Sequence, residues 1–145
     1  TKDGPKVLEF NARFGDPETQ PILMLLKNDL LDIFCSAIHG SLHKTSFEWV
    51  DGYAVCVVLA SKGYPDKYEK GKILKVGEIP AHTIVFHAGT AFNEEKELIT
   101  AGGRVIGVTS TGRTIEEAIR NVYYSVGEVQ YTGMQYRTDI GIKQE

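Results

Sequence analysis

The sequence predicts an α+β fold, in which helices lie on either side of a β-rich stretch. Apolar residues recur every three or four positions within residues 22–38, as they do on one face of a helix. Residues 49–109 are rich in β-branched and aromatic residues interrupted by glycines, which favours strands and turns. A second helical pattern begins at residue 114. Because the pattern changes at a polar linker, we expect two domains, at residues 1–46 and 47–145.

Composition and charge exclude several classes of protein. At 145 residues the chain fits one ordinary domain, or a small domain plus part of another. With 42% hydrophobic residues and a net charge of −3, it is globular and lacks the clustered basic residues of a nucleic-acid-binding protein. Its longest apolar run, residues 54–60, is far shorter than the roughly 20 residues of a bilayer span. We therefore expect neither nucleic acid nor a membrane as partner.

The N-terminus and the two cysteines bear on where the protein is located. The chain starts at Thr1 without Met or an apolar leader, so we expect no signal peptide, a cut end and a cytoplasmic protein. Cys35 and Cys56 lie far apart, each within an apolar stretch. This placement predicts two reduced thiols in the core, whereas a disulfide would need the two Cα atoms within about 7 Å.

The first predicted element is a strand at residues 6–14. Polar residues occupy every second position, and alternate side chains of a strand share one face. Glu9, Asn11 and Arg13 would then point the same way. The opposite face would place three apolar residues in a core: Leu8, Phe10 and Ala12.

A helix should follow, entered at Asp16-Pro17 or at Gln20-Pro21, because proline is tolerated in a first turn. Its apolar stripe is broken at Asn28-Asp29, and Gly40 is a natural C-terminal stop.

The β-rich stretch reads as several short strands. We expect strands at residues 53–60, 72–75 and 83–88, with a loop at residues 61–71. Residues 91–109 should form a hairpin that turns at its Gly-Gly pair.

The clearest helix starts at Thr114. Thr114 and Glu117 form a capping box, in which each side chain satisfies a free backbone N–H at the helix start. Residues predicted for the core of the second domain are Trp49, Val55, Val57, Ile106, Ile119, Val122 and Tyr123.

The strongest candidate site is Glu9-x-Asn11-x-Arg13. Carboxylate and amide oxygens are hard ligands that suit Mg²⁺, and two strand steps place Glu9 and Asn11 close enough to share one ion. Arg13 could bind an anion such as a phosphate in bidentate fashion. From spacing alone, a solvated polar face with a Glu9–Arg13 ion pair remains the alternative.

The other patterns are weaker evidence for a functional site. Cys35, His39 and His43 lack a fourth zinc ligand, and Gly40 should end the helix between the histidines. The histidines bordering the strand at residues 83–88, His82 and His87, could reach a site, but we assign them to structure.

Several motifs match one family. Val7–Gln20 closely resembles the signature stretch of glycinamide ribonucleotide synthetase (phosphoribosylamine–glycine ligase), an ATP-grasp enzyme of purine synthesis. Further similar stretches, in the same order along the chain, are Val55–Ser61, Gly63–Pro65, Phe86–Thr90, Gly102–Val105 and Gly133–Gly141.

The resemblance implies a fold and an activity. Residues 1–46 would be the tail end of the ATP-grasp module, and residues 47–145 a β-rich, barrel-sandwich-like hybrid domain with one packed helix. The intact enzyme would join glycine to 5-phosphoribosylamine through a glycyl phosphate and convert ATP to ADP and phosphate. This piece alone would be inactive, and its partner would be the rest of its own chain. The alternative is a free-standing, non-catalytic β-rich interaction domain.

The resemblance also implies roles for residues. Glu9 and Asn11 would bind Mg²⁺ or Mn²⁺ at the phosphates of the substrate ATP, and Arg13 would stabilise the acyl phosphate. Three more residues would line the substrate pocket: Asp16, Glu18 and Thr19.

Overall fold

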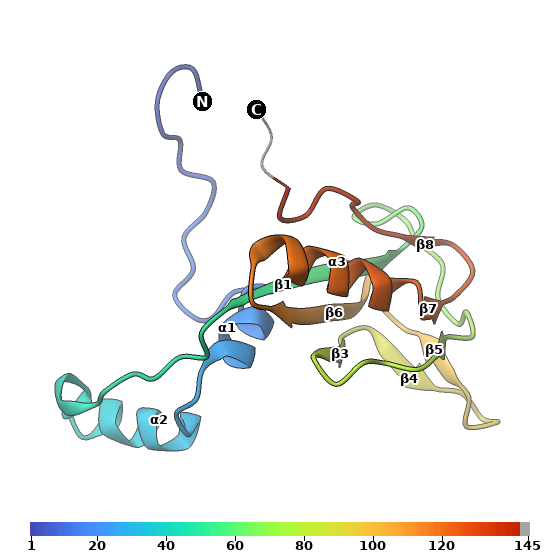
Figure 1. Cartoon of the computed structure of the whole chain (residues 1–145). Coiled ribbons are helices and arrows are strands. Elements are labelled where there is room, and N and C mark those ends of the chain that lie inside the picture. The colour runs from blue at the N-terminus through green and yellow to red at the C-terminus, as the bar shows by residue number, and fades with distance from the viewer. Residues whose placement is uncertain (143–145) are drawn as a thin grey trace.

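A four-stranded antiparallel sheet forms the centre of the computed structural model, which describes residues 1–142 (Figure 1). Its strand order is β3-β6-β1-β8, with bounds Thr83–His87, Arg104–Gly112, Tyr53–Ser61 and Met134–Gln135. The two long strands, β1 and β6, pair from Tyr53↔Gly112 to Ala60↔Arg104, with an irregularity after Leu59. The strands predicted at residues 53–60 and 83–88 are thus confirmed as β1 and β3.

Two small sheets flank the central one. β2 (Lys75–Val76) pairs with β7 (Val129–Gln130), and β4 (Thr90–Phe92) pairs with β5 (Leu98–Thr100). The short strand predicted at residues 72–75 therefore lies slightly later in the chain.

The core lies between one sheet face and α3 (Ile115–Val126). Alternate residues of β1 point to this face, as the period of a strand requires. The helix begins as predicted, because the Thr114 hydroxyl accepts from the Glu117 N–H at 3.2 Å. Glu117 in turn accepts from the N–H of Arg113, one residue earlier than in an ideal capping box, at 2.7 Å. Buried residues that meet here are Val55, Val57, Leu59, Ala118, Val122 and Val126.

α1 (Thr19–Leu25) packs on the opposite face of the sheet. A side chain added at Gly107 would meet the Cys56 Sγ at 3.4 Å and the Gln20 Nε2 at 3.7 Å. Cys56 alternates with the core-facing residues of β1, so α1 and α3 enclose the sheet between them.

α2 (Leu30–Ile38) projects away from the sheet (Figure 1). The predicted break at Asn28-Asp29 is confirmed, because Asp29 caps α2 by accepting from the Leu31 N–H at 2.8 Å. Gly40, with a φ of +67°, ends the helix in a Schellman motif in which the Ser41 N–H donates to the Ser36 carbonyl. The linker that follows contains a short 3₁₀ helix, η1 (Leu42–Lys44).

The strand predicted at residues 6–14 is wrong. These residues form neither helix nor strand, and the segment extends away from the sheet (Figure 1). Leu8 is 97% exposed and Phe10 91% exposed, and Ala12 is exposed too, so none of the three reaches a core. A strand is stabilised by hydrogen bonds to a neighbour, and no described strand pairs with this segment.

The hairpin predicted at residues 91–109 is also wrong. β5 pairs with β4, whereas β6 pairs with β1 and β3. The Gly-Gly pair instead lets two backbones approach, since the N–H groups of Ala101 and Gly102 both donate to the Gly89 carbonyl. A Cβ added at Gly89 would lie 2.5 Å from the Gly102 Cα, and one added at Gly102 would lie 2.8 Å from the Gly89 Cα.

Two burial predictions need correction. Trp49 is 49% exposed, because it bridges to Leu26 outside the core. Both cysteines are free, but only Cys56 is buried, since Cys35 lies on the exposed α2. The other predicted core residues are buried or pack against the core. Among the described residues, no helix is long and apolar enough to cross a membrane.

Candidate functional site

Glu9, Asn11 and Arg13 form a chain of side-chain hydrogen bonds along the extended segment. Asn11 Nδ2 donates to Glu9 Oε1 at 3.3 Å, and Arg13 Nη1 donates to Asn11 Oδ1 at 3.0 Å. Alternate residues share a side here although no strand forms, because an extended backbone has a period of two. The alternative of a direct Glu9–Arg13 ion pair is not seen among the described residues, since Asn11 lies between them.

The turn that follows leads into α1. The Gly15 carbonyl accepts from both the N–H and the hydroxyl of Thr19, which fixes the start of the helix. Glu18 occupies the N-cap position without a side-chain capping bond. Thr19 therefore has a structural partner, whereas the Glu18 carboxylate is not used for capping.

A cavity of about 490 Å³ brings part of the predicted site together. Arg13, Asp16 and Thr19 line it, whereas Glu9, Asn11 and Glu18 are outside its lining. Its other walls come from Phe14, Gly15, Gln20 and Leu23 and, across the sheet, from Phe86 and His87 of β3.

Two further polar residues line this cavity that were not assigned to the site from the sequence. The Gln20 Oε1 is buried and has no hydrogen-bond partner among the described residues. The His87 Nδ1 lies 3.1 Å from the Thr90 hydroxyl, which orients the ring. His87, which we assigned to structure, therefore also lines the candidate site. The similar stretch Phe86–Thr90 was the available signal.

The donor set fits a hard divalent cation only in part. Glu9 and Asn11 offer one carboxylate and one amide oxygen, both exposed. The described residues contain no group of three or more His, Cys, Asp or Glu that could hold a metal. Mg²⁺ commonly takes one or two protein carboxylates and completes its shell with phosphates and water. Glu9 and Asn11 are thus adequate only beside a phosphorylated ligand.

Charged and titratable groups around the turn are few. The Asp16 carboxylate lies 3.3 Å from Arg104 Nη1, at the start of β6. Beneath α1, burial raises the pKa of the Cys56 thiol. Cys56 therefore stays a neutral thiol and is no candidate nucleophile.

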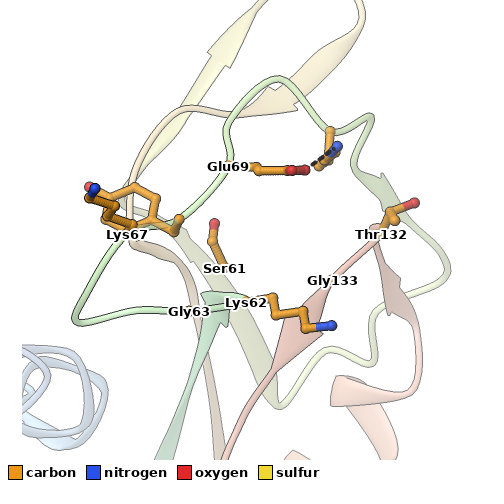
Figure 2. A pocket seen from close by; sticks show the side chains of 9 residues that line it. Ser61, Lys62, Gly63, Lys67, Glu69, Thr132 and Gly133 are labelled. Atoms are coloured by element: carbon orange, nitrogen blue, oxygen red, sulfur yellow. Dashed lines mark ion pairs between the residues drawn. The ribbon is translucent and has the colours of Figure 1, made fainter.

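A separate cavity of about 670 Å³ lies at the C-terminal end of β1, where Ser61 lines it. Figure 2 shows Lys62 beside the segment carrying Thr132 and Gly133, with Glu69 opposite. Glu69 pairs with Lys72 at 2.7 Å, and this hydrogen bond and the lysine charge lower the pKa of the carboxyl. None of the predicted site residues lines this cavity.

Comparison with known proteins identifies the family. A family model described as phosphoribosylglycinamide synthetase, C domain, matches residues 54–143. The chain belongs to this family. The matched residues include nearly all of the central sheet and the whole of α3, which belong to the phosphoribosylglycinamide synthetase C domain. The resemblance inferred from the motifs is confirmed.

Relatives match beyond this domain. A phosphoribosylamine–glycine ligase of Caldanaerobacter subterraneus is 49% identical over 97% of this chain and 33% of its own length. The crystal structure of phosphoribosylamine–glycine ligase from Thermotoga maritima has a TM-score of 0.70 and 40% identity, over 93% of this chain and 33% of that one. The chain thus spans about a third of the length of these relatives.

A more distant solved structure shares only the fold. Urea carboxylase of Kluyveromyces lactis has a TM-score of 0.59 at 19% identity, over 91% of this chain and 12% of that one.

Proposed function

We propose that this chain is the C-terminal part of a phosphoribosylamine–glycine ligase. In the complete enzyme, ATP phosphorylates the glycine carboxylate, and the nitrogen of 5-phosphoribosylamine attacks the glycyl phosphate, releasing phosphate. The observation that carries the proposal is the cavity in which Arg13, Asp16 and Thr19 meet, within a segment that the ligase relatives also cover. By itself the chain is inactive, because a ligand site on one exposed segment does not replace a nucleotide cleft.

The roles of the residues follow from their charge and position. Arg13 lines the cavity, and its positive charge would stabilise the acyl phosphate, since catalysis of phosphoryl transfer depends mainly on positioning and charge neutralisation. Asp16, Glu18 and Thr19 would line the substrate pocket. Of these, Glu18 has a carboxylate free of capping.

Glu9 and Asn11 would hold Mg²⁺ or Mn²⁺ beside the phosphates of ATP. Such a cation, when bound, neutralises charge on the transferred phosphoryl group. To bind it, Asn11 must turn its amide oxygen from Arg13, whose Nη1 then keeps its bond to the Phe14 carbonyl and can turn its other N–H groups to the anionic substrate.

The remaining expectations belong to the same proposal. Residues 1–46 would be the tail of the ATP-grasp module, and residues 47–145 the barrel-sandwich-like hybrid domain. The exposed apolar residues of the first segment, such as Leu8 and Phe10, would then contact the rest of the enzyme's own chain. Free thiols at Cys35 and Cys56 are in keeping with a cytoplasmic location.

A chimera tests the proposal. This chain replaces the matching third of the Caldanaerobacter ligase, and ADP release is measured with and without glycine and 5-phosphoribosylamine. We expect ADP release that depends on both substrates, and none from the ligase cut short at the junction. A chimera that folds and binds ATP but releases no ADP would favour the non-catalytic interaction domain.

A further inference from the structure

One arginine joins the candidate site to the central sheet. Arg104 is the first residue of β6, where it pairs with Ala60 of β1. Its Nη1 donates to the Asp16 carbonyl at 2.7 Å and lies 3.3 Å from the Asp16 carboxylate. The same guanidinium therefore holds both the backbone and the side chain of a residue 88 positions earlier.

The arginine is itself held from the other side. Its Nε donates to the Tyr64 hydroxyl at 3.2 Å. Tyr64 is fixed in turn, since its carbonyl accepts from Gln135 Nε2 at 3.0 Å and its N–H donates to the Ser61 carbonyl at 3.0 Å. The guanidinium thus contacts the Tyr64 loop through Nε and the Asp16 turn through Nη1.

We propose that Arg104 is a positioning residue for the reaction, which clamps the Asp16 turn onto the sheet and so sets the place of the substrate-binding residues. This inference rests on the proposed function. The planar fork of arginine suits the task, because it can contact the Tyr64 hydroxyl together with the carbonyl and carboxylate oxygens of Asp16, whereas lysine offers one point charge.

The clamp should matter for geometry more than for folding. The Arg104 and Asp16 side chains are 39% and 57% exposed, and ion pairs this exposed contribute little to stability. A small displacement of substrate-binding groups, by contrast, lowers the rate strongly. Arg104→Met should therefore leave the melting temperature nearly unchanged and loosen the turn.

Hydrogen exchange of this chain tests the clamp directly. The amides of Thr19 and Ile22 donate to the Gly15 and Glu18 carbonyls, at 3.0 and 3.3 Å. In Arg104→Met they should exchange about five-fold faster, with β1 and α3 unchanged. Arg120→Met, at an exposed position of α3, is the matched control and should change neither amide. Equal exchange in wild type and Arg104→Met overturns the clamp.

Kinetics of the chimera test its use in the reaction. Arg104→Met should lower kcat/KM for glycine roughly 100-fold while KM for ATP stays within about two-fold. Arg104→Lys should remain at least about ten-fold below wild type. Full activity of Arg104→Met overturns the proposal, because then the contacts of the arginine are not needed. Full activity of Arg104→Lys overturns the part of it that rests on the planar fork. An inactive parent chimera speaks against the proposed function alone, since the exchange result still decides the clamp.

Discussion

The residues before β1 and those from β1 onward differ in where their apolar side chains lie. Among residues 1–52 none is buried, and Leu8 and Phe10 are almost fully exposed. From β1 onward, Val57, Ile106 and Val122 have no exposed surface at all. The predicted catalytic and metal-binding residues all belong to the first region, and the hydrophobic core belongs to the second.

This difference teaches that the hydrophobic core and the proposed metal-binding and catalytic residues lie in separate parts of the chain, joined by a few residues such as His87 and Arg104. A change in the first region should affect the reaction and leave folding intact. A change at a core residue of the second should affect folding first. Four substitutions test this separation.

The largest effect should come from Glu9→Gln in the chimera. The change keeps the shape but removes the charge on which a hard cation depends. We expect kcat/KM to fall at least ~100-fold, or about 2.7 kcal/mol at 1.36 kcal/mol per factor of ten. Thermal stability without nucleotide should be unchanged, because Glu9 is exposed. Steady-state kinetics at saturating Mg²⁺ beside a melting curve would show the opposite pattern if Glu9 were only structural.

Val122→Ala should act on folding. Val122 is fully buried between α3 and the sheet, and truncating a buried branched side chain costs roughly 1–3 kcal/mol. Leu31→Ala on α2, where the side chain is 67% exposed, is the control and should change the free energy of unfolding by less than about 0.5 kcal/mol. Urea denaturation of this chain measures both. Equal losses in the two variants would mean that the first region is no less packed than the second.

Tyr131→Phe should stabilise the chain slightly. Tyr131 is 9% exposed, and its hydroxyl is buried without a hydrogen-bond partner among the described residues. Removing an unsatisfied buried group recovers desolvation energy, here about 1 kcal/mol. Urea denaturation should show a higher midpoint, and a lower midpoint would point to a bound water or a partner at this hydroxyl.

The smallest effect concerns Cys56 at alkaline pH. Burial raises the pKa of its thiol, so the folded state favours the neutral form. Its contribution is complete below the unfolded pKa of about 8.5 and is lost as the pH rises above it, by at most about 0.8 kcal/mol at pH 9. Cys56→Ala should lack this loss. Unfolding free energies of both proteins at pH 7 and pH 9 give the difference, and parallel losses would assign it to other groups.

The β1 strand and the α3 helix could be predicted because their signals are local. A run of β-branched residues and a capping box report on the few residues around them. The strand expected at residues 6–14 had the same kind of local signal. It failed because pairing needs a second strand, which a local pattern does not supply.

The candidate site could be predicted in its chemistry but not in its walls. Arg13 and Asp16 stand out by residue type and spacing. His87 and Arg104 come from strands about 70 and 90 residues later, and only the packing of α1 on the sheet brings them near. A Gly-Gly pair is equally ambiguous, because a tight turn and a close backbone approach both require glycine.

The contact between Gly89 and Gly102 limits how this sequence can change over time. Each position excludes any side chain because of the backbone of the other, so a replacement at one is not relieved by a replacement at its neighbour. No pair of mutations offers a path through a tolerated intermediate. In a library of random variants selected for folding, both glycines should therefore persist while exposed positions of α2 vary.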